Sequence, residues 1–361
     1  MKIISISIKL ILVIMILSCN HESNNNNEAA TIKIDNEEHE FYLTYDPKEQ
    51  KKKDRVWKEL RIRNLFEIGG VTDTILLNPI SLKVDKDDNI FVIDLGDFSI
   101  KKFNKDGKIV KKIGRKGRGP NEFVMPFNLD VNKNNILVSD AELNRCSYFK
   151  KDSANTIKMN FAPTRGSIFS DQEIIVLQID DLSRYPHLIK CNLAGKILTK
   201  YENIIQADQI DAAYRFNPLF IGDIFTHNKN LIYIPNFMNH ILCYSDNGDL
   251  KYSVKTIDHI EEPVLKMKRL NGGYAVSASF PVSQMSSFHA QIFRNHILIL
   301  SKQATNRYNA KVLDIYSAAN GNYLYSYKVF DIDLVSSIYF TNERVCYITP
   351  QGSIKVSELI M

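Results

Sequence analysis

The chain has 361 residues, of which 44% are hydrophobic and 24% are charged, a composition that excludes a wholly disordered or fibrous protein. Such a length can bury a large core without disulfides or metal ions, in one large domain or two ordinary ones. The 46 Lys and Arg residues against 41 Asp and Glu give a net charge of +5, and the basic residues are scattered, so no nucleic-acid partner is expected.

Residues 1–18 have the pattern of a secretory signal peptide. Two lysines precede the apolar run 10–17, which is too short to span a bilayer as a helix. The sequence Ile-Leu-Ser-Cys at 16–19 resembles the bacterial lipobox, in whose family the cysteine becomes the acylated first residue of the mature protein. We therefore expect Cys19 to carry the lipid that anchors the protein to a bilayer, and an ordinary secretory signal with a chance cysteine is the alternative.

Residues 19–30 are polar and contain no aromatic side chain, so they are expected to form a flexible tether between the lipid and the folded domain. Position 20 is Asn rather than the Asp that resembles the enteric inner-membrane retention signal. Glu22 matches a single residue of the acidic export signal of surface lipoproteins in Bacteroidetes. These features favour an envelope protein at the outer membrane, and they leave its leaflet open.

The cysteines other than Cys19 lie in apolar, strand-like runs and show no CxxC or Cys/His spacing of a zinc site. We expect buried free thiols, with disulfides as the alternative. These residues are Cys146, Cys191, Cys243 and Cys346.

The body of the chain is a repeat. Pro79 and Pro126 are 47 positions apart, and Asp94 and Asp140, each at the end of an apolar run, are 46 apart. A period of this size is typical of propeller blades or helical arrays. The alternating strand patterns and the Gly- and Asn-containing hairpin turns select the propeller.

The repeat continues for five units, and a sixth begins near residue 337 but ends after three strands. Residues 66–69 resemble residues 111–114, where the outer strand of the first unit leads into the next. We therefore expect Arg61–Ile68 to pair with the C-terminal hairpin and close the ring. The sequence thus predicts an all-β, six-bladed β-propeller over residues 31–361, with an N-terminal strand closing the last blade.

One stretch does not fit the period. The turn glycines Gly248 and Gly321 are 73 positions apart, which is too long for one blade and too short for two. We expect an insertion around residues 261–287, and a seventh blade is the alternative.

The most distinctive segment is the glycine-rich stretch 113–126. It lacks the Gly-Lys-Ser/Thr and following helix of a phosphate loop, and it leads into a strand instead. We interpret it as the crossover between the first two blades, with Phe123 filling the gap between sheets and Pro126 beginning the next strand. The residues given this structural role are Gly114, Gly117, Gly119, Pro120, Phe123 and Pro126.

The pattern Gly-Arg-x-Gly-x-Gly-Pro-x-Glu-Phe-x-x-Pro, followed by a blade ending in Val-x-Asp, resembles NHL-repeat propellers. More narrowly it resembles the six-bladed, TolB-like β-propeller lipoproteins of Bacteroidetes. The match runs from about Pro79 to Phe149. The resemblance implies a lipid-anchored envelope propeller that acts as a binding or scaffold protein, and it is nearly silent on activity.

The charged residues of the crossover have two interpretations. Arg115, Lys116, Arg118 and Glu122 form a candidate binding face, a cationic rim that would hold an acidic ligand. Alternatively, Glu122 pairs with an arginine and fixes the loop. For Asp94 and Asp140, recurrence at one blade position favours a hydrogen bond to a turn or between blades over catalysis.

Metal and catalytic motifs are weak. Asp85-x-Asp87-x-Asn89 begins like a calcium loop but lacks the following Gly and the Glu at the twelfth position, so a plain turn is favoured. The histidines show no HExxH spacing, and there is no GxSxG elbow. We expect no metal site, assign no catalytic residue and expect no cofactor, with calcium as the alternative. The histidines considered are His187, His227, His240, His259 and His289.

Propeller enzymes place their sites in the central channel, on the innermost strands. Those strands are predicted to carry polar residues without an evident ring of acids and histidines. The leading interpretation is therefore a non-enzymatic module that binds a peptide, a glycan or an envelope protein. The alternative is a metal-dependent hydrolase or lyase, similar to lactonases. The expected channel residues are Ser81, Lys83, Asn128, Asp130, Ser167 and Asp223.

Overall fold

The computed structural model describes residues 15–16, 30–34, 37–70, 73–151, 153–178, 187–202, 204–206, 220–258, 265–270, 273–275, 287–330, 332 and 337–360. Cys19 and almost all of the expected tether lie outside these residues. Within the predicted signal peptide, only β1 (Met15–Ile16) is described. The described part contains no helix long and apolar enough to cross a membrane.

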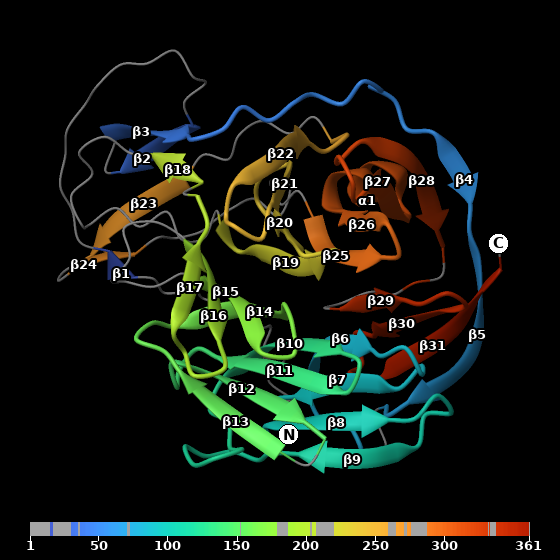
Figure 1. Ribbon diagram of the computed structural model, residues 1–361. Coiled ribbons are helices and arrows are strands. Elements are labelled where there is room, and N and C mark those ends of the chain that lie inside the picture. The colour runs from blue at the N-terminus through green and yellow to red at the C-terminus, as the bar shows by residue number, and fades with distance from the viewer. Residues whose placement is uncertain are drawn as a thin grey trace.

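The predicted fold class is confirmed: the chain forms an all-β propeller of six blades arranged in a ring (Figure 1). Blade 1 comprises β6 (Pro79–Val84), β7 (Ile90–Asp94), β8 (Ser99–Phe103) and β9 (Ile109–Ile113); blade 2 β10 (Pro126–Asn132), β11 (Asn135–Asp140), β12 (Arg145–Lys150) and β13 (Ser153–Lys158); blade 3 β14 (Pro163–Ile168), β15 (Glu173–Gln178), β16 (His187–Asn192) and β17 (Ile197–Lys200). Blade 4 comprises β19 (Gly222–His227), β20 (Asn230–Pro235), β21 (His240–Tyr244) and β22 (Leu250–Lys255); blade 5 β25 (Ser287–Phe293), β26 (His296–Ser301), β27 (Lys311–Ser317) and β28 (Tyr323–Val329); blade 6 β29 (Ile338–Phe340), β30 (Arg344–Ile348), β31 (Ile354–Ile360) and β5 (Arg61–Ile68).

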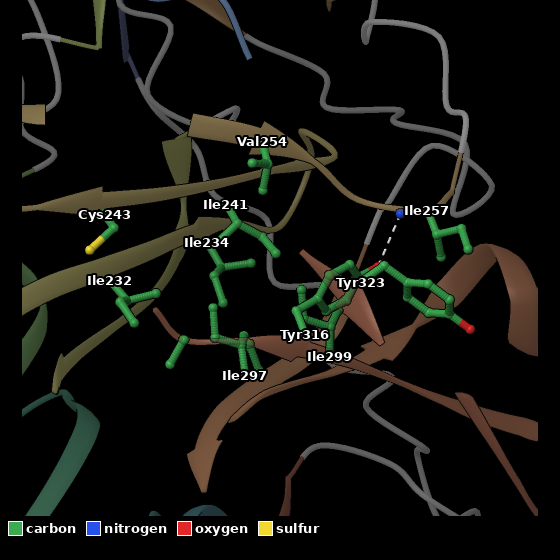
Figure 2. Close-up of a cluster of buried hydrophobic side chains, with 12 residues drawn as sticks. Ile232, Ile234, Ile241, Cys243, Val254, Ile257, Ile297, Ile299, Tyr316 and Tyr323 are labelled. Carbon is green, nitrogen blue, oxygen red and sulfur yellow. Dashed lines mark hydrogen bonds between the residues drawn. The ribbon is translucent and has the colours of Figure 1, made fainter. Parts of the chain in front are cut away.

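The core lies between the faces of adjacent blades. The second strand of each blade is covered on both sides, which is why β7 reads as an unbroken apolar run and is buried throughout. Figure 2 shows the contact of blades 4 and 5, where Ile234 and Ile241 face Ile297 and Ile299. The buried Tyr316 hydroxyl of this core is paired as well, because it accepts from the N–H of Ile257 at 3.0 Å.

The ring is closed by segments from opposite ends of the chain, as predicted. β5 pairs antiparallel with β31, from Ile68 opposite Ile354 to Arg61 opposite Ile360. The fourth strand of blade 6 is thus supplied by the N-terminal part of the chain, which couples the two ends and leaves no gap in the ring.

Residues 44–60 form a strap along the outer edges of blades 4 and 5, which was not predicted. The backbone of Lys48 forms an isolated parallel β-bridge with Val254 on β22. The Gln50 side chain donates hydrogen bonds to the carbonyls of Lys255 and Gly321. β4 (Trp57–Glu59) then pairs parallel with β28 as a fifth strand of blade 5. In Figure 1 this segment follows the rim of the ring before entering β5.

A further sheet lies beside the ring. Its strand order is β1, β24 (Gly273–Ala275), β23 (Leu265–Leu270), β2 (Ala30–Ile34), β3 (Glu37–Leu43) and β18 (Ile205–Gln206). The expected insertion 261–287 therefore contributes β23 and β24 to this sheet, and β2 and β3 lie in it rather than in a blade. The helix α1 (Lys302–Tyr308), between β26 and β27, accounts for more of the extra length.

The prediction of free thiols is confirmed for the four cysteines that the structure describes: Cys146, Cys191, Cys243 and Cys346 are all buried and unpaired. Burial raises the pKa of the Cys191 thiol to about 11 and those of Cys146 and Cys346 to about 12. These thiols are therefore packing groups rather than nucleophiles.

Candidate functional site

The innermost strands of the six blades surround a central channel and carry its side chains. In four of them the pairing register shifts near the start of the strand, at Ile80/Leu82, Pro126/Asn128, Pro163/Arg165 and Ser287/His289. Such a β-bulge bends the strand and re-aims the side chains beside it. The channel residues are thus positioned by the same irregularity in blades 1, 2, 3 and 5.

A belt of side-chain hydrogen bonds runs around the channel and joins every pair of neighbouring blades. An innermost strand has one edge without a strand partner, so its N–H groups need other acceptors. In five of the six contacts, a side chain of one blade accepts from a backbone N–H on the innermost strand of the next blade. In the sixth, the hydroxyls of Ser167 and Thr226 meet across the gap between two blades. The contacts are Ser81 Oγ with Leu129 N (3.1 Å), Asn128 Oδ1 with Gly166 N (2.8 Å), Ser167 Oγ with Thr226 Oγ1 (3.3 Å), Asp223 Oδ2 with Ala290 N (2.9 Å), Gln291 Oε1 with Phe340 N (2.8 Å) and Ser337 Oγ with Leu82 N (3.0 Å).

The belt explains most of the polar residues that the sequence placed in the channel. Ser81, Asn128, Ser167 and Asp223 are members of it, and Asp130 accepts from the N–H of Ile168 at 2.7 Å. These groups hold the blades in register, and their hydrogen-bonding capacity is largely used by the fold. Lys83 is the exception among the expected channel residues.

A cavity of about 190 Å³ lies in the channel beside the belt, between the innermost strands. Its charged and titratable lining comes from four blades: Lys83 on β6, Arg165 on β14, Asp223 on β19 and His289 on β25. Three of these four groups are basic. The single carboxylate already accepts the N–H of Ala290, so the cavity has an excess of cationic and donor groups.

Asp223 lies between Arg165 and His289. Arg165 Nε is 3.9 Å from Asp223 Oδ1, and His289 Nδ1 is 3.8 Å from Asp223 Oδ2. Burial lowers the pKa of His289 to about 4, with Lys83 and Arg165 acting in the same direction and Asp223 and the Ile338 backbone opposing them. At neutral pH the imidazole is therefore uncharged, and its buried Nε2 has no hydrogen-bond partner among the described residues.

Lys83 is the cation of the cavity that has no counter-ion among the described residues. Its Nζ is 5.5 Å from the ring centroids of both Phe225 and Tyr339, and it forms no ion pair with a described residue. The half-buried ammonium is thus held by two aromatic faces, which attract a cation without neutralising it. The arrangement is suited to receive an anionic group.

A metal centre does not fit this lining. Among the described side chains, no group of three or more His, Cys, Asp and Glu residues lies close enough to hold an ion. The Asp85 carboxylate of the calcium-like segment instead accepts the N–H groups of Asp87 and Asn89, both at 2.9 Å, and closes a turn.

The predicted candidate face lies on the crossover between blades 1 and 2. Glu122 accepts from the N–H of Gly119 at 2.7 Å and from Arg115 Nε at 2.9 Å. The Gly119 hydrogen bond, and to a smaller extent the Arg115 one, lower the pKa of Glu122. Arg118 lies 3.4 Å from Glu142, and Lys116 Nζ lies 5.0 Å above the Phe98 ring.

The same loop is held from below by Arg145, which sequence reasoning missed. Its buried guanidinium donates to the carbonyls of Arg118 (3.4 Å), Gly119 (3.0 Å) and Glu122. Phe123 is fully buried between blades 1 and 2, packed with Phe91, Ile100 and Phe149 among others. The loop is thus rigidly seated, with Arg115, Lys116 and Arg118 exposed on its outer side.

Asp94 and Asp140 occupy equivalent places. The buried Asp94 carboxylate accepts from the N–H groups of Leu77 (2.9 Å), Asn78 (2.7 Å) and Gly96 (2.9 Å), and from Lys101 Nζ at 2.6 Å. Asp140 accepts from the N–H groups of Val124, Met125 and Leu143 at 2.9–3.2 Å. Each aspartate therefore fixes the segment that enters the innermost strand of its own blade.

Arg165 and His289 were not assigned to the channel from the sequence. Arg165 is two positions after Pro163, just as Ser81 and Asn128 follow the strand-initiating prolines of blades 1 and 2. Aligning Pro163 with those prolines would have found it. His289 is preceded by no such proline, because Ser287 stands at the equivalent position, so the sequence carries no signal of this kind for it.

Comparison with known proteins supports the fold. A family model described as "6-bladed beta-propeller" matches residues 71–173. A putative exported protein from Bacteroides fragilis is 11% identical with a TM-score of 0.53, covering 87% of this chain and 99% of that one. A member of the duf4221 family from Bacteroides vulgatus is 11% identical with a TM-score of 0.54, covering 84% and 98%. A catalytically inactive virginiamycin B lyase from Staphylococcus aureus, solved with quinupristin, is 13% identical with a TM-score of 0.52, covering 84% and 100%. No curated protein matches the chain.

Proposed function

We propose that this protein is a non-enzymatic binding module that receives an anionic group of its ligand in the central channel. The observation that carries the proposal is Lys83, a half-buried ammonium with no ion pair to any described residue, at a cavity also lined by Arg165. Binding of an anion to a partly desolvated cation is favourable, because the charge-assisted contact replaces the water that remains around the ammonium.

The size of the cavity restricts what enters it. A volume of about 190 Å³ is below the 300–1,000 Å³ typical of pockets that enclose a whole drug-sized ligand. The channel therefore takes a carboxylate or phosphate group, and the rest of the ligand lies outside it. A peptide, a glycan or an envelope protein that presents such a group fits this description.

The cellular setting is part of the proposal. The lipobox-like segment ending in Cys19, the NHL-like and TolB-like features of the first two blades, and the exported Bacteroides fragilis protein of the same fold support a lipid-anchored propeller at the outer membrane. Metabolic labelling with radioactive palmitate tests it. We expect label in the natural chain and none in Cys19→Ala, and label in both would contradict acylation at this cysteine.

The channel is tested with inorganic phosphate and citrate as probes, using a chain that begins at residue 20 and so keeps β2 whole. Isothermal titration is expected to detect binding that Lys83→Met weakens by at least about tenfold, because the variant removes the unpaired charge. Lys86→Met is the matched control, since Lys86 is 68% exposed and lies outside the channel. Equal binding by the Lys83 variant and the natural chain would overturn the proposal.

A lyase is the second candidate, and one observation favours it. His289 is neutral at pH 7, lies 3.8 Å from Asp223 and lines the channel, so it can accept a proton there, although its lowered pKa makes it a weak base. The neighbouring lyase structure shares the fold at 13% identity. The cation-rich lining does not suit a divalent metal, so elemental analysis of the purified protein tests the metal-dependent form: stoichiometric calcium or zinc would favour the enzyme over the binding module.

A further inference from the structure

A second cationic depression lies away from the channel, between the outer parts of blades 1 and 2. Its volume is about 550 Å³, and two buried rings, Phe91 and Phe149, contribute to its lining. Four of its lining residues are lysines, and no described Asp or Glu lines it. We call it the interblade groove. The lysines are Lys102, Lys111, Lys112 and Lys151.

The four lysines are not equally neutralised. Lys112 Nζ lies 2.9 Å from the carboxylate of Asp97, and Lys102 Nζ lies 3.9 Å from that of Asp85. Lys111 and Lys151 are exposed and form no ion pair with any residue that the structure describes. Counting only the residues that the structure describes, two positive charges of the groove are uncompensated, one on β9 and one at the β12–β13 turn.

Neutral hydrogen-bonding groups lie among these charges. Asn121 of the crossover and Asn134 of the β10–β11 hairpin line the groove, and so does Ser153, whose hydroxyl donates to the Lys150 carbonyl at 2.8 Å and keeps its acceptor sites. Amides and hydroxyls donate to and accept from sugar hydroxyls, whereas ammonium groups pair with carboxylates or phosphates. This mixture of charged and neutral lining residues matches a ligand that carries both acidic groups and hydroxyls.

We propose that the interblade groove binds a segment of an acidic polysaccharide, with its carboxylate or phosphate groups on Lys111 and Lys151 and its hydroxyls on the neighbouring amides. An acidic peptide would satisfy the lysines but would meet Asn121 and Asn134 through its backbone amides, whereas every sugar ring of a polysaccharide offers them several hydroxyls. The site is separate from the channel, because no residue lines both cavities. It therefore stands or fails independently of the proposed function.

The probes are a galacturonate octasaccharide, a neutral maltooctaose and an octaglutamate peptide, each titrated calorimetrically into the protein at low salt. We expect the acidic sugar to bind, the neutral sugar to show no measurable binding, and the peptide to bind several-fold more weakly. Affinity for the acidic sugar should fall as salt rises, since exposed charges are screened. Binding of the peptide as tight as that of the acidic sugar, or no binding of the acidic sugar, would overturn the proposal.

Paired variants locate the site. Lys111→Gln with Lys151→Gln is expected to weaken galacturonate binding about fivefold, through the loss of two exposed charge contacts. Lys196→Gln with Lys200→Gln removes the same charge from exposed positions on blade 3 and should leave the affinity unchanged. Each titration is repeated in Lys83→Met, which removes the proposed channel contribution, so a loss caused by the Lys111 and Lys151 pair in that background reports on the groove alone. An equal loss in the blade 3 pair would show that net charge alone is responsible and would reject the groove.

Discussion

Arg55 donates two parallel hydrogen bonds to the carboxylate of Asp314, from Nε to Oδ1 at 2.9 Å and from Nη2 to Oδ2 at 2.8 Å. Arg55 belongs to the N-terminal strap, and Asp314 lies in the middle of β27. Their side chains are only 9% and 1% exposed. The same guanidinium contacts Asp258, which also accepts the hydroxyl of Ser301. The strap is therefore fastened to blade 5 by a buried, charged contact.

Replacing Arg55 by Met should destabilise the protein by about 3–5 kcal/mol, because two buried carboxylates lose their cation. Urea unfolding followed by the fluorescence of Trp57, the single tryptophan and part of the adjacent β4, measures this loss. Arg61→Met is the control, since the Arg61–Glu59 pair is 76% and 86% exposed and its loss should change the free energy of unfolding by no more than about 0.5 kcal/mol. Similar effects of the two substitutions would contradict the assignment.

The penalty of Arg55→Met should shrink at low pH. Burial raises the pKa of Asp314, and Arg55 opposes that rise, so removing Arg55 raises this pKa further. A carboxyl with a folded-state pKa above its unfolded value binds more protons in the folded state, and stability then increases as pH falls. Unfolding at pH 7 and pH 4 should show a smaller difference between variant and natural chain at pH 4. A difference that grows toward pH 4 would contradict this account.

His289 should make the natural protein lose stability in mild acid. Its folded pKa of about 4 lies below the ordinary value of 6.5, so the unfolded chain binds the extra proton first. Stability is unaffected above pH 6.5 and falls by roughly 3 kcal/mol as pH decreases from 6.5 to 4. His289→Gln should flatten this part of the stability profile, and NMR titration of the His289 ring should show no midpoint near 6.5.

Asp94 and Asp140 are equivalent in position, but their replacement by Asn should lower the free energy of unfolding by different amounts. Asp94→Asn leaves the Lys101 ammonium, 5% exposed, without its closest carboxylate, and about 3 kcal/mol or more should be lost. Within the described part of the chain Asp140 accepts only backbone N–H groups, so Asp140→Asn should cost about 1–2 kcal/mol. Urea unfolding of both variants ranks them, and a larger loss for Asp140→Asn would be inconsistent with the geometry.

Gly114 should be intolerant of a side chain. Its φ is +85°, and a Cβ there would lie 2.7 Å from Cδ2 of the buried Phe123 ring. Gly114→Ala should cost about 3 kcal/mol or more, from overlap in addition to backbone strain. Gly70 also has a positive φ, +146°, but no atom within 4 Å of a Cβ, so Gly70→Ala should cost about 1 kcal/mol. Thermal denaturation of the two variants isolates the cost of the Phe123 contact.

Periodicity in the sequence was enough to predict the ring. Pro79 and Pro126 begin equivalent innermost strands, and the incomplete last unit required Arg61–Ile68 as its fourth strand. These inferences succeed because blades repeat local physics: apolar alternation sets which face is buried, and turn residues set where strands end.

The channel site and the strap depended on the tertiary structure. Lys83, Arg165 and His289 are far apart in the sequence, and they meet because bulged innermost strands from different blades converge on one axis. Arg55 finds its partner 259 positions later, in a pairing that no local pattern encodes. The sequence alone determined the repeating sheets through short-range spacing. Only closure of the ring decided which charges share a cavity, because that depends on the curvature and register of every blade together.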